Sequence, residues 1–372
     1  MNDRVSPRVT GDAQYAAWQR RETPPVEQVR PGLWSIPLPN PDSGIRYVLC
    51  YLVEHDDGVL VVDPGWNDER SWVALVGGLQ RAGRTAAEVS GIVVTHAHPD
   101  HLGGARRLRA ESGAPVLMHQ ADQALLPVDA GDPSAILDRT GPWLARQGCP
   151  PQLVTEFGTD TAELATYFHL SRPDGFLEDG DRLPLAGRDW IAIHTPGHTP
   201  GHLCLHARDE RLLLTGDHLL PRITPAVSAF PASGPHPLAS YLRSLSRAGA
   251  LDVDEVLPAH EWRFAGLAER SEAVAEHHAQ REEEVLALLA DGPAPAARLT
   301  EQLTWSRPWS DIRPSMRRMA VAETVAHLQL LRDNGQLTVE QRDAVDIWQR
   351  ADLAAAPDEL ATTAGGDELA GA

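Results

Sequence analysis

Four side chains of types that commonly bind metal ions occur within six positions of the segment THAHPDH. They are His96, His98, Asp100 and His101, and the apolar run before them predicts a strand over residues 91–98. Alternation along this strand would send His96 and His98 to the same side, where both imidazoles can bind one cation. The chain then turns, so that Asp100 and His101 can reach a second ion. Imidazole and carboxylate ligands together suit Zn²⁺, with Fe²⁺ or Mn²⁺ as alternatives.

The same relationship between a strand and a metal-binding side chain recurs three times further along the chain. His198 follows an apolar strand, between Gly197 and Gly201, which allow sharp backbone turns. Asp217 ends the run LLLTGD, and His260 ends EVLPAH. Strand ends converge on one edge of a layered sheet structure, so these side chains are expected to meet there. A histidine-rich turn exposed to solvent would explain the first motif but not this recurrence.

Taken together, these motifs resemble those of the metallo-β-lactamase fold superfamily, in its glyoxalase-II-like hydrolase branch. The resemblance covers about residues 30–265 and implies an α/β fold, an αβ/βα sandwich that holds two metals at its edge. It also implies a role for each residue. His96, His98 and His198 would bind the first metal, Asp100, His101 and His260 would bind the second, and Asp217 would bridge both. Asp63, in VVDPG, matches an early turn of the family and would support a ligand without binding metal.

A pair of metals implies a particular reaction class. Two divalent ions about 3.5–4 Å apart can share one hydroxide and lower the pKa of its parent water towards 7. Asp217 would then hold the spacing of the ions, and Asp100 would orient the hydroxide as well as bind metal. No serine or cysteine nucleophile is needed, and the sequence contains no GxSxG motif. We therefore predict metal-assisted hydrolysis.

The substrate is less constrained by these motifs. Our first hypothesis is a small-molecule thioester or ester, with a pocket shaped by residues 39–47 and by an insertion over 126–178 that can act as a lid. The C-terminal segment does not resemble the glutathione-binding domain of glyoxalase II. Phosphodiester hydrolysis, as in lactamase-β-like endoribonucleases, and lactone hydrolysis remain alternatives. An oxygen- or nitric-oxide-reducing scaffold is disfavoured because no flavodoxin-like segment follows.

Short β-rich runs alternating with helices predict layered sheets flanked by helices. We expect a loose N-terminal leader over residues 1–28 with room for a short helix, and a catalytic domain over 29–266. Helical patterns and then a short strand predict a small winged-helix-like domain over 267–350. Residues 351–372 are rich in small and polar residues and are expected to be disordered.

Charge disfavours a nucleic-acid partner. The chain has 372 residues and a net charge of −19, and all 33 basic residues are arginines because lysine is absent. Such a chain is repelled by phosphate backbones unless its basic residues cluster. In the C-terminal domain, acidic residues outnumber arginines, and only Arg313, Arg317 and Arg318 lie close together. That domain could instead pack on the catalytic domain or pair two subunits in a homodimer.

Neither the cysteines nor the remaining histidines suggest a further site. Cys50, Cys149 and Cys204 are too few and too widely spaced for a disulfide framework, so we interpret them as buried apolar residues in a reducing cytoplasm. The sequence shows no secretory signal and no apolar run long enough to span a membrane. His194 and His202 flank the ligand loop and, like His119, are interpreted as structural.

Overall fold

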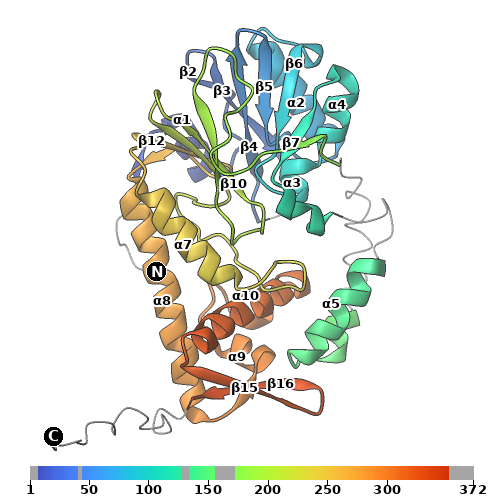
Figure 1. Cartoon of the computed structure of the whole chain (residues 1–372), viewed down its shortest axis with the longest axis vertical. Coiled ribbons are helices and arrows are strands. Elements are labelled where there is room, and N and C mark those ends of the chain that lie inside the picture. Colours follow the sequence, from blue (N-terminus) through green and yellow to red (C-terminus); the bar gives the residue numbers. More distant parts are fainter. Residues whose placement is uncertain (1–6, 41–43, 127–133, 156–171, 352–372) are drawn as a thin grey trace, which may run out of the picture.

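The computed structural model describes residues 7–40, 44–126, 134–155 and 172–351, with side chains throughout except at 134–139. Two β-sheets face each other across an apolar core, and helices cover their outer faces (Figure 1). A smaller unit from the C-terminal part of the chain, orange to red in Figure 1, lies below them. The predicted αβ/βα sandwich is confirmed.

The first sheet has seven strands in the same order as in the sequence. They are β2 (Glu27–Arg30), β3 (Leu33–Pro39), β4 (Tyr47–His55), β5 (Gly58–Val62), β6 (Val89–Val93), β7 (Val116–Met118) and β8 (Gly175–Phe176). Strands β2 to β5 run antiparallel, and β5 to β8 run parallel. Helices α2 (Glu69–Arg81) and α4 (Ala105–Ser112) pack on the outer face. In α2, Asp68 caps the first turn through the Ser71 N–H, and Leu75 and Leu79 share the buried face.

The second sheet has six strands in the order β1-β13-β12-β11-β10-β9. They are β1 (Arg8–Val9), β9 (Trp190–His194), β10 (Leu203–Ala207), β11 (Leu212–Gly216), β12 (Glu255–Pro258) and β13 (Phe264–Ala265). Strands β11 and β12 are parallel, whereas their other neighbours are antiparallel. Helix α7 (Pro237–Gly249) covers the outer face with Leu238, Tyr241 and Leu245, which recur at helical spacing.

The C-terminal unit follows the predicted order of three helices and a hairpin, with one more short strand. It consists of α8 (Leu267–Leu288), β14 (Ala294–Pro295), α9 (Ala296–Gln302), α10 (Pro314–Asp333), β15 (Leu337–Arg342) and β16 (Val345–Arg350). Its sheet has the order β14-β16-β15. Val325 and Leu328 of α10 belong to the same apolar cluster as Tyr241 of α7 and Val274 of α8. The unit therefore shares its core with the sandwich.

The N-terminal segment differs from the loose leader that we expected. Strand β1 pairs with β13, and α1 (Asp12–Gln19) places Tyr15 and Trp18 against Trp262. These contacts make residues 7–28 part of the sandwich domain. We did not predict this packing from the sequence, because β1 is only two residues long and α1 has a weak apolar face.

Only part of the insertion over 126–178 is described. Helix α5 (Ser134–Arg146) lies beside the C-terminal unit, where Arg146 pairs with Asp346 at 2.8 Å and the Gln147 carbonyl accepts the Ala297 N–H. Residues 127–133 and 156–171 lie outside the described residues, so the lid stays a prediction. The predicted disordered tail also lies outside them, apart from Ala351. Other helical turns are α3 (Pro99–Leu102), η1 (Ala86–Glu88), η2 (Gln120–Leu125), η3 (Leu289–Asp291) and η4 (Trp309–Asp311). Within the described ranges, every helix is too short or too polar to cross a membrane.

Candidate metal centre

The predicted ligands gather at one edge of the sandwich because of strand direction. Parallel strands β5 and β6 end at this edge in one sheet, and parallel strands β11 and β12 end at it in the other. The segments that follow β6, β9, β11 and β12 carry all seven predicted ligands. Strand β6 ends at Val93, however, so His96 and His98 lie in the bend beyond it. We expected strand alternation to bring the two imidazoles together, and this was wrong. The conformation of the loop after β6 brings them together instead.

Two groups of candidate ligands form there. The first ligand group comprises His96, His98, His198 and Asp217, and the second comprises Asp100, His101 and His260. Within each group the ligand atoms all lie within 4.8 Å of one another. The Nδ1 atom of His98 lies 2.9 Å from His96 Nε2 and 3.0 Å from His198 Nε2. Three nitrogens this close together point at a common centre.

Asp217 lies between the two groups. Its Oδ2 is 3.6 Å from His198 Nε2 in the first group, and its Oδ1 is 3.1 Å from His260 Nε2 in the second. In the second group, Asp100 Oδ2 lies 3.6 Å from His260 Nε2 and 3.8 Å from His101 Nε2. One carboxylate thus faces both groups, as a bridging ligand must.

Hydrogen bonds fix the orientation of three of the imidazoles. In each case Nδ1 donates to an oxygen held by the fold, which leaves the Nε2 lone pair available to a metal. His101 donates to Asp63 Oδ2 at 2.8 Å, His260 to the Tyr47 carbonyl at 2.8 Å, and His198 to the Ala226 carbonyl at 2.7 Å. Asp63 also accepts the backbone and hydroxyl protons of Thr95, both at 2.8 Å. It thereby ties the end of β6 to His101.

Three atoms of the cluster test whether a cation fits. His101 Nε2, His260 Nε2 and Asp217 Oδ1 are buried and make no hydrogen bond with any residue that the structure describes. Such unpaired buried polar atoms are costly in a folded protein unless something else satisfies them. All three belong to side chains with the donor types that Zn²⁺ binds. The residues therefore fit divalent cations.

The pKa values of the ligands support the same conclusion. Burial lowers the pKa of His96 well below its usual value and that of His98 to about 3, and neighbouring imidazoles add to both effects. Burial also lowers the pKa of His101, but the surrounding carboxylates, Asp100 first, outweigh it and raise that pKa to about 10. The first group thus favours the neutral imidazole that binds metal, and the second surrounds its imidazoles with negative charge.

Asp122 was missed by sequence reasoning, although it joins the two ligand loops. Its fully buried carboxylate accepts the Ala97 N–H at 2.8 Å, the Gly201 N–H at 2.5 Å and the Thr199 hydroxyl at 2.9 Å. A Cβ on Gly201 would lie 2.7 Å from the Asp122 backbone nitrogen, so the contact requires glycine. Asp122 belongs to no recognisable motif, and its partners lie far from it in the sequence. The sequence therefore gave no signal for its role.

The histidines that flank the ligand loop fall outside both ligand groups. His202 donates or accepts at Thr195 Oγ1 (2.8 Å), and its Nε2 accepts the Asp217 backbone N–H at 3.1 Å. It therefore positions Asp217. His194 stacks on His119 with ring centroids 3.8 Å apart, and its Nε2 donates to the Pro200 carbonyl.

Comparison with known proteins places this site in a family. Residues 43–260 match the model of the metallo-beta-lactamase superfamily. The chain belongs to this superfamily. A metallo-beta-lactamase family protein from Thermus thermophilus has a similar structure, with a TM-score of 0.74 and 29% identity, covering 87% of this chain and 100% of that one.

The names of some curated relatives mention a reaction. The chain is 26% identical to the probable metallo-hydrolase YqjP of Bacillus subtilis (strain 168), over 82% of this chain and 93% of the relative. It is 33% identical to the acyl-coenzyme A thioesterase MBLAC2 of Gallus gallus, over 34% of this chain and 40% of the relative. The second similarity is confined to a minority of each chain.

Proposed function

We propose that the chain hydrolyses a small-molecule thioester or ester with the help of two divalent cations, Zn²⁺ being the first choice. Superfamily membership and the His/Asp cluster identify it as a metal-dependent hydrolase. The observation that carries the proposal of two cations is the position of Asp217, which faces both ligand groups. The thioesterase name of one relative supports the substrate class.

His96, His98 and His198 would hold one cation, and Asp100, His101 and His260 the other. Bound there, the cations would supply Lewis-acid polarisation of the substrate and an activated water nucleophile. Asp217 would keep them at a fixed spacing. His202 supports that role because it holds the backbone of Asp217.

The side of the cluster that is open to substrate is defined by side-chain exposure. The side chains of His96, His101 and His260 are fully buried, whereas those of Asp100 and Asp217 are 17% and 11% exposed. Asn40 Nδ2 donates to Asp100 Oδ2 at 3.3 Å and fixes the outer carboxylate. Asp100 therefore stands where substrate arrives, with an oxygen that can orient the attacking water.

A cysteine nucleophile is a poor alternative. All three cysteines are buried. Burial raises the pKa of Cys204 and of Cys149 to about 12, and that of Cys50 well above its usual value. Thiols with such pKa values are not ionised near neutral pH and do not attack carbonyl carbon efficiently.

A substrate panel tests the proposal. Metal-loaded protein would be assayed with acyl thioesters, simple esters, lactones, bis-p-nitrophenyl phosphate and single-stranded RNA, and its metal content would be measured. We expect two metals per chain and the highest kcat/KM with thioesters or esters. A higher kcat/KM with the phosphate diester or RNA, or one metal or none in active protein, would contradict the proposal.

A further inference from the structure

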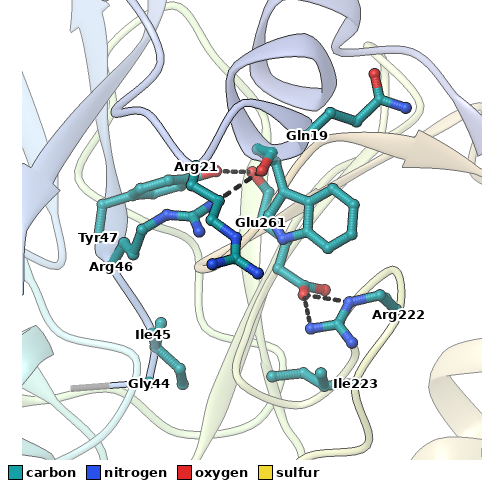
Figure 2. A pocket seen from close by; sticks show the side chains of 10 residues that line it. Gln19, Arg21, Gly44, Ile45, Arg46, Tyr47, Arg222, Ile223 and Glu261 are labelled. Atoms are coloured by element: carbon teal, nitrogen blue, oxygen red, sulfur yellow. Dashed lines mark hydrogen bonds and ion pairs between the residues drawn. The ribbon is translucent and has the colours of Figure 1, made fainter.

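A recess lined by charged side chains lies beside the candidate metal centre. It has a volume of about 420 Å³, and Trp18, Arg21, Arg46, Tyr47, Arg222 and Glu261 face it. In the view of Figure 2, the three guanidinium groups point into the same space, with that of Arg21 between the other two. We call this recess the arginine pocket.

Residues on one side of the arginine pocket are linked to the second ligand group by hydrogen bonds. The Tyr47 carbonyl accepts His260 Nδ1–H, and the Tyr47 hydroxyl donates to the carbonyl of Glu261 at 2.7 Å (Figure 2). Glu261 directly follows the ligand His260 in the sequence. On the same wall, the Asn40 backbone N–H donates to the Arg46 carbonyl, while the Asn40 side chain contacts Asp100.

Residues on the opposite side of the arginine pocket belong to a segment that contacts the first ligand group. Arg222 lies on the segment between β11 and α7, which follows Asp217. Arg270 of α8 holds this segment by donating to the carbonyls of Leu220 and Ile223 at 2.7 and 2.9 Å. Three residues beyond Ile223, the Ala226 carbonyl accepts His198 Nδ1–H. A group bound in the arginine pocket is therefore connected to both ligand groups through short, hydrogen-bonded segments.

The described residues that line the arginine pocket carry more positive than negative charge. Arg222 pairs with Glu261 at 2.8 Å. Arg46 donates to the Trp18 carbonyl at 3.0 Å, and its buried Nε has no hydrogen-bond partner within the part of the chain that the structure describes. Among the described residues, the Arg21 guanidinium makes no hydrogen bond or ion pair. Three arginines and one glutamate leave an excess of positive charge, in a chain whose net charge is −19.

The backbone at two of the charged residues is held in an unfavourable conformation. Arg21 has φ +59° and Glu261 has φ +71°, in the left-handed region that favours glycine. Side chains other than glycine persist there when the surrounding structure enforces them, commonly at binding sites. At Arg21 this conformation follows the end of α1 and turns the side chain towards the recess (Figure 2).

We propose that the arginine pocket binds an anionic group of the substrate, a phosphate or a carboxylate, while the scissile acyl group lies at the metal centre. This proposal rests on the proposed thioester or ester hydrolysis and narrows its substrate class to anionic thioesters or esters. Guanidinium groups suit this role because their paired N–H groups match the oxygens of carboxylates and phosphates. Arg21 and Arg46 supply the unfilled donors, and Arg222 adds charge.

A set of thioesters that share one acyl group tests the proposal. The acyl-coenzyme A carries phosphates, the S-acyl glutathione carries carboxylates, and the acyl-N-acetylcysteamine carries no charge. Metal-loaded wild type would be compared with Arg21→Gln and with the control Arg243→Gln, which alters an exposed arginine of α7 that contacts Ser240. We expect Arg21→Gln to lower kcat/KM at least tenfold for whichever charged thioester the wild type prefers. It should lower kcat/KM less than twofold for the neutral thioester, and Arg243→Gln should change neither.

Equal losses of kcat/KM with charged and neutral thioesters, or no loss with either, would overturn the arginine pocket as an anion site. If the wild type hydrolyses none of the three and no ester of the substrate panel, the proposed function fails. Calorimetry with inorganic sulfate then tests separately whether the arginine pocket binds anions. Binding to metal-loaded protein that weakens at least fivefold in Arg21→Gln but not in Arg243→Gln would support an anion site. Identical binding by all three proteins, or none by the wild type, would rule it out.

Discussion

The carboxylate of Asp122 accepts the backbone N–H of Gly201, 79 residues further along the chain, at 2.5 Å. Its second oxygen accepts the backbone N–H of Ala97. Ala97 separates the ligands His96 and His98, and Gly201 ends the turn that carries His198. One buried side chain thus holds together the two loops that form the first ligand group.

We predict that Asp122→Asn weakens metal binding by about 10–100-fold, the range typical for residues that orient ligands. The amide has one acceptor oxygen, and its NH₂ group would face an N–H donor. Competition with a chelator would measure the metal affinity, and circular dichroism would monitor the fold. Asp174→Asn is the matched control, because Asp174 also accepts a backbone N–H, from Val116, but lies at the surface. Unchanged metal affinity in Asp122→Asn would contradict the role assigned to Asp122.

Asp217→Asn should affect both ligand groups at once. We expect kcat to fall by more than about 100-fold, because the charge between the two cations is lost, and metal-assisted stabilisation is worth several kcal/mol. Metal content per chain should fall as well, while the circular dichroism spectrum is retained. The exposed Asp254, paired with Arg211, provides the control Asp254→Asn. Near-normal turnover by Asp217→Asn would show that Asp217 is not the bridge.

Most strands of the sandwich could be predicted from the sequence, because they are continuous apolar runs. In β4, for example, residues 47–53 are all buried, so the pattern YVLCYLV predicts the strand directly. The candidate ligands could be proposed from the sequence because each follows such a strand. Of the supporting contacts, that of Asp63 with His101 was expected from the VVDPG turn. Those of Asp122 and the Ala226 carbonyl were not, because they involve backbone groups that lie far away in the sequence and leave no pattern. The same holds for β1, whose two residues become a strand only through β13.

Two hydrogen bonds link the C-terminal unit to the candidate metal centre through the segment that contains Ala226 and Ala229. The Ala229 N–H donates to the Ala322 carbonyl of α10 at 3.0 Å, and Ala226, in the same segment, holds His198. The shared apolar cluster adds to this coupling. The C-terminal unit thus supports the segment that positions the candidate ligand His198. Sequence patterns cannot reveal such a relationship between elements.

This shared core predicts a single unfolding transition. Leu328→Ala removes a fully buried side chain of α10 and should lower the free energy of unfolding by about 2–5 kcal/mol. Val73→Ala, at a position 61% exposed, should change it by less than about 0.5 kcal/mol. Denaturant unfolding followed by fluorescence and by circular dichroism would test both. Two separate unfolding transitions, of which Leu328→Ala destabilises only one, would mean that the units fold independently.

Glu323 of α10 makes the stability of the protein depend on pH. It is partly exposed, yet burial raises its pKa from 4.5 to about 7, and the Arg281 guanidinium lowers it by a smaller amount. Between these two pH values the folded protein holds a proton that the unfolded chain has released. The contribution of Glu323 to stability therefore falls as pH rises through this window and stays low above it.

Glu323→Gln should remove this dependence, because the amide does not ionise. We expect the Tm of metal-loaded Glu323→Gln to be close to that of the wild type at pH 5 and to exceed it increasingly up to pH 8. Thermal unfolding of the two proteins across this range would give the difference in Tm at each pH. The contributions of titrating groups that both proteins share cancel in this difference. Glu301→Gln, on the exposed side of α9, is the control and should show no such trend. A constant difference in Tm from pH 5 to 8 would mean that Glu323 ionises in the folded protein as easily as it does in the unfolded chain.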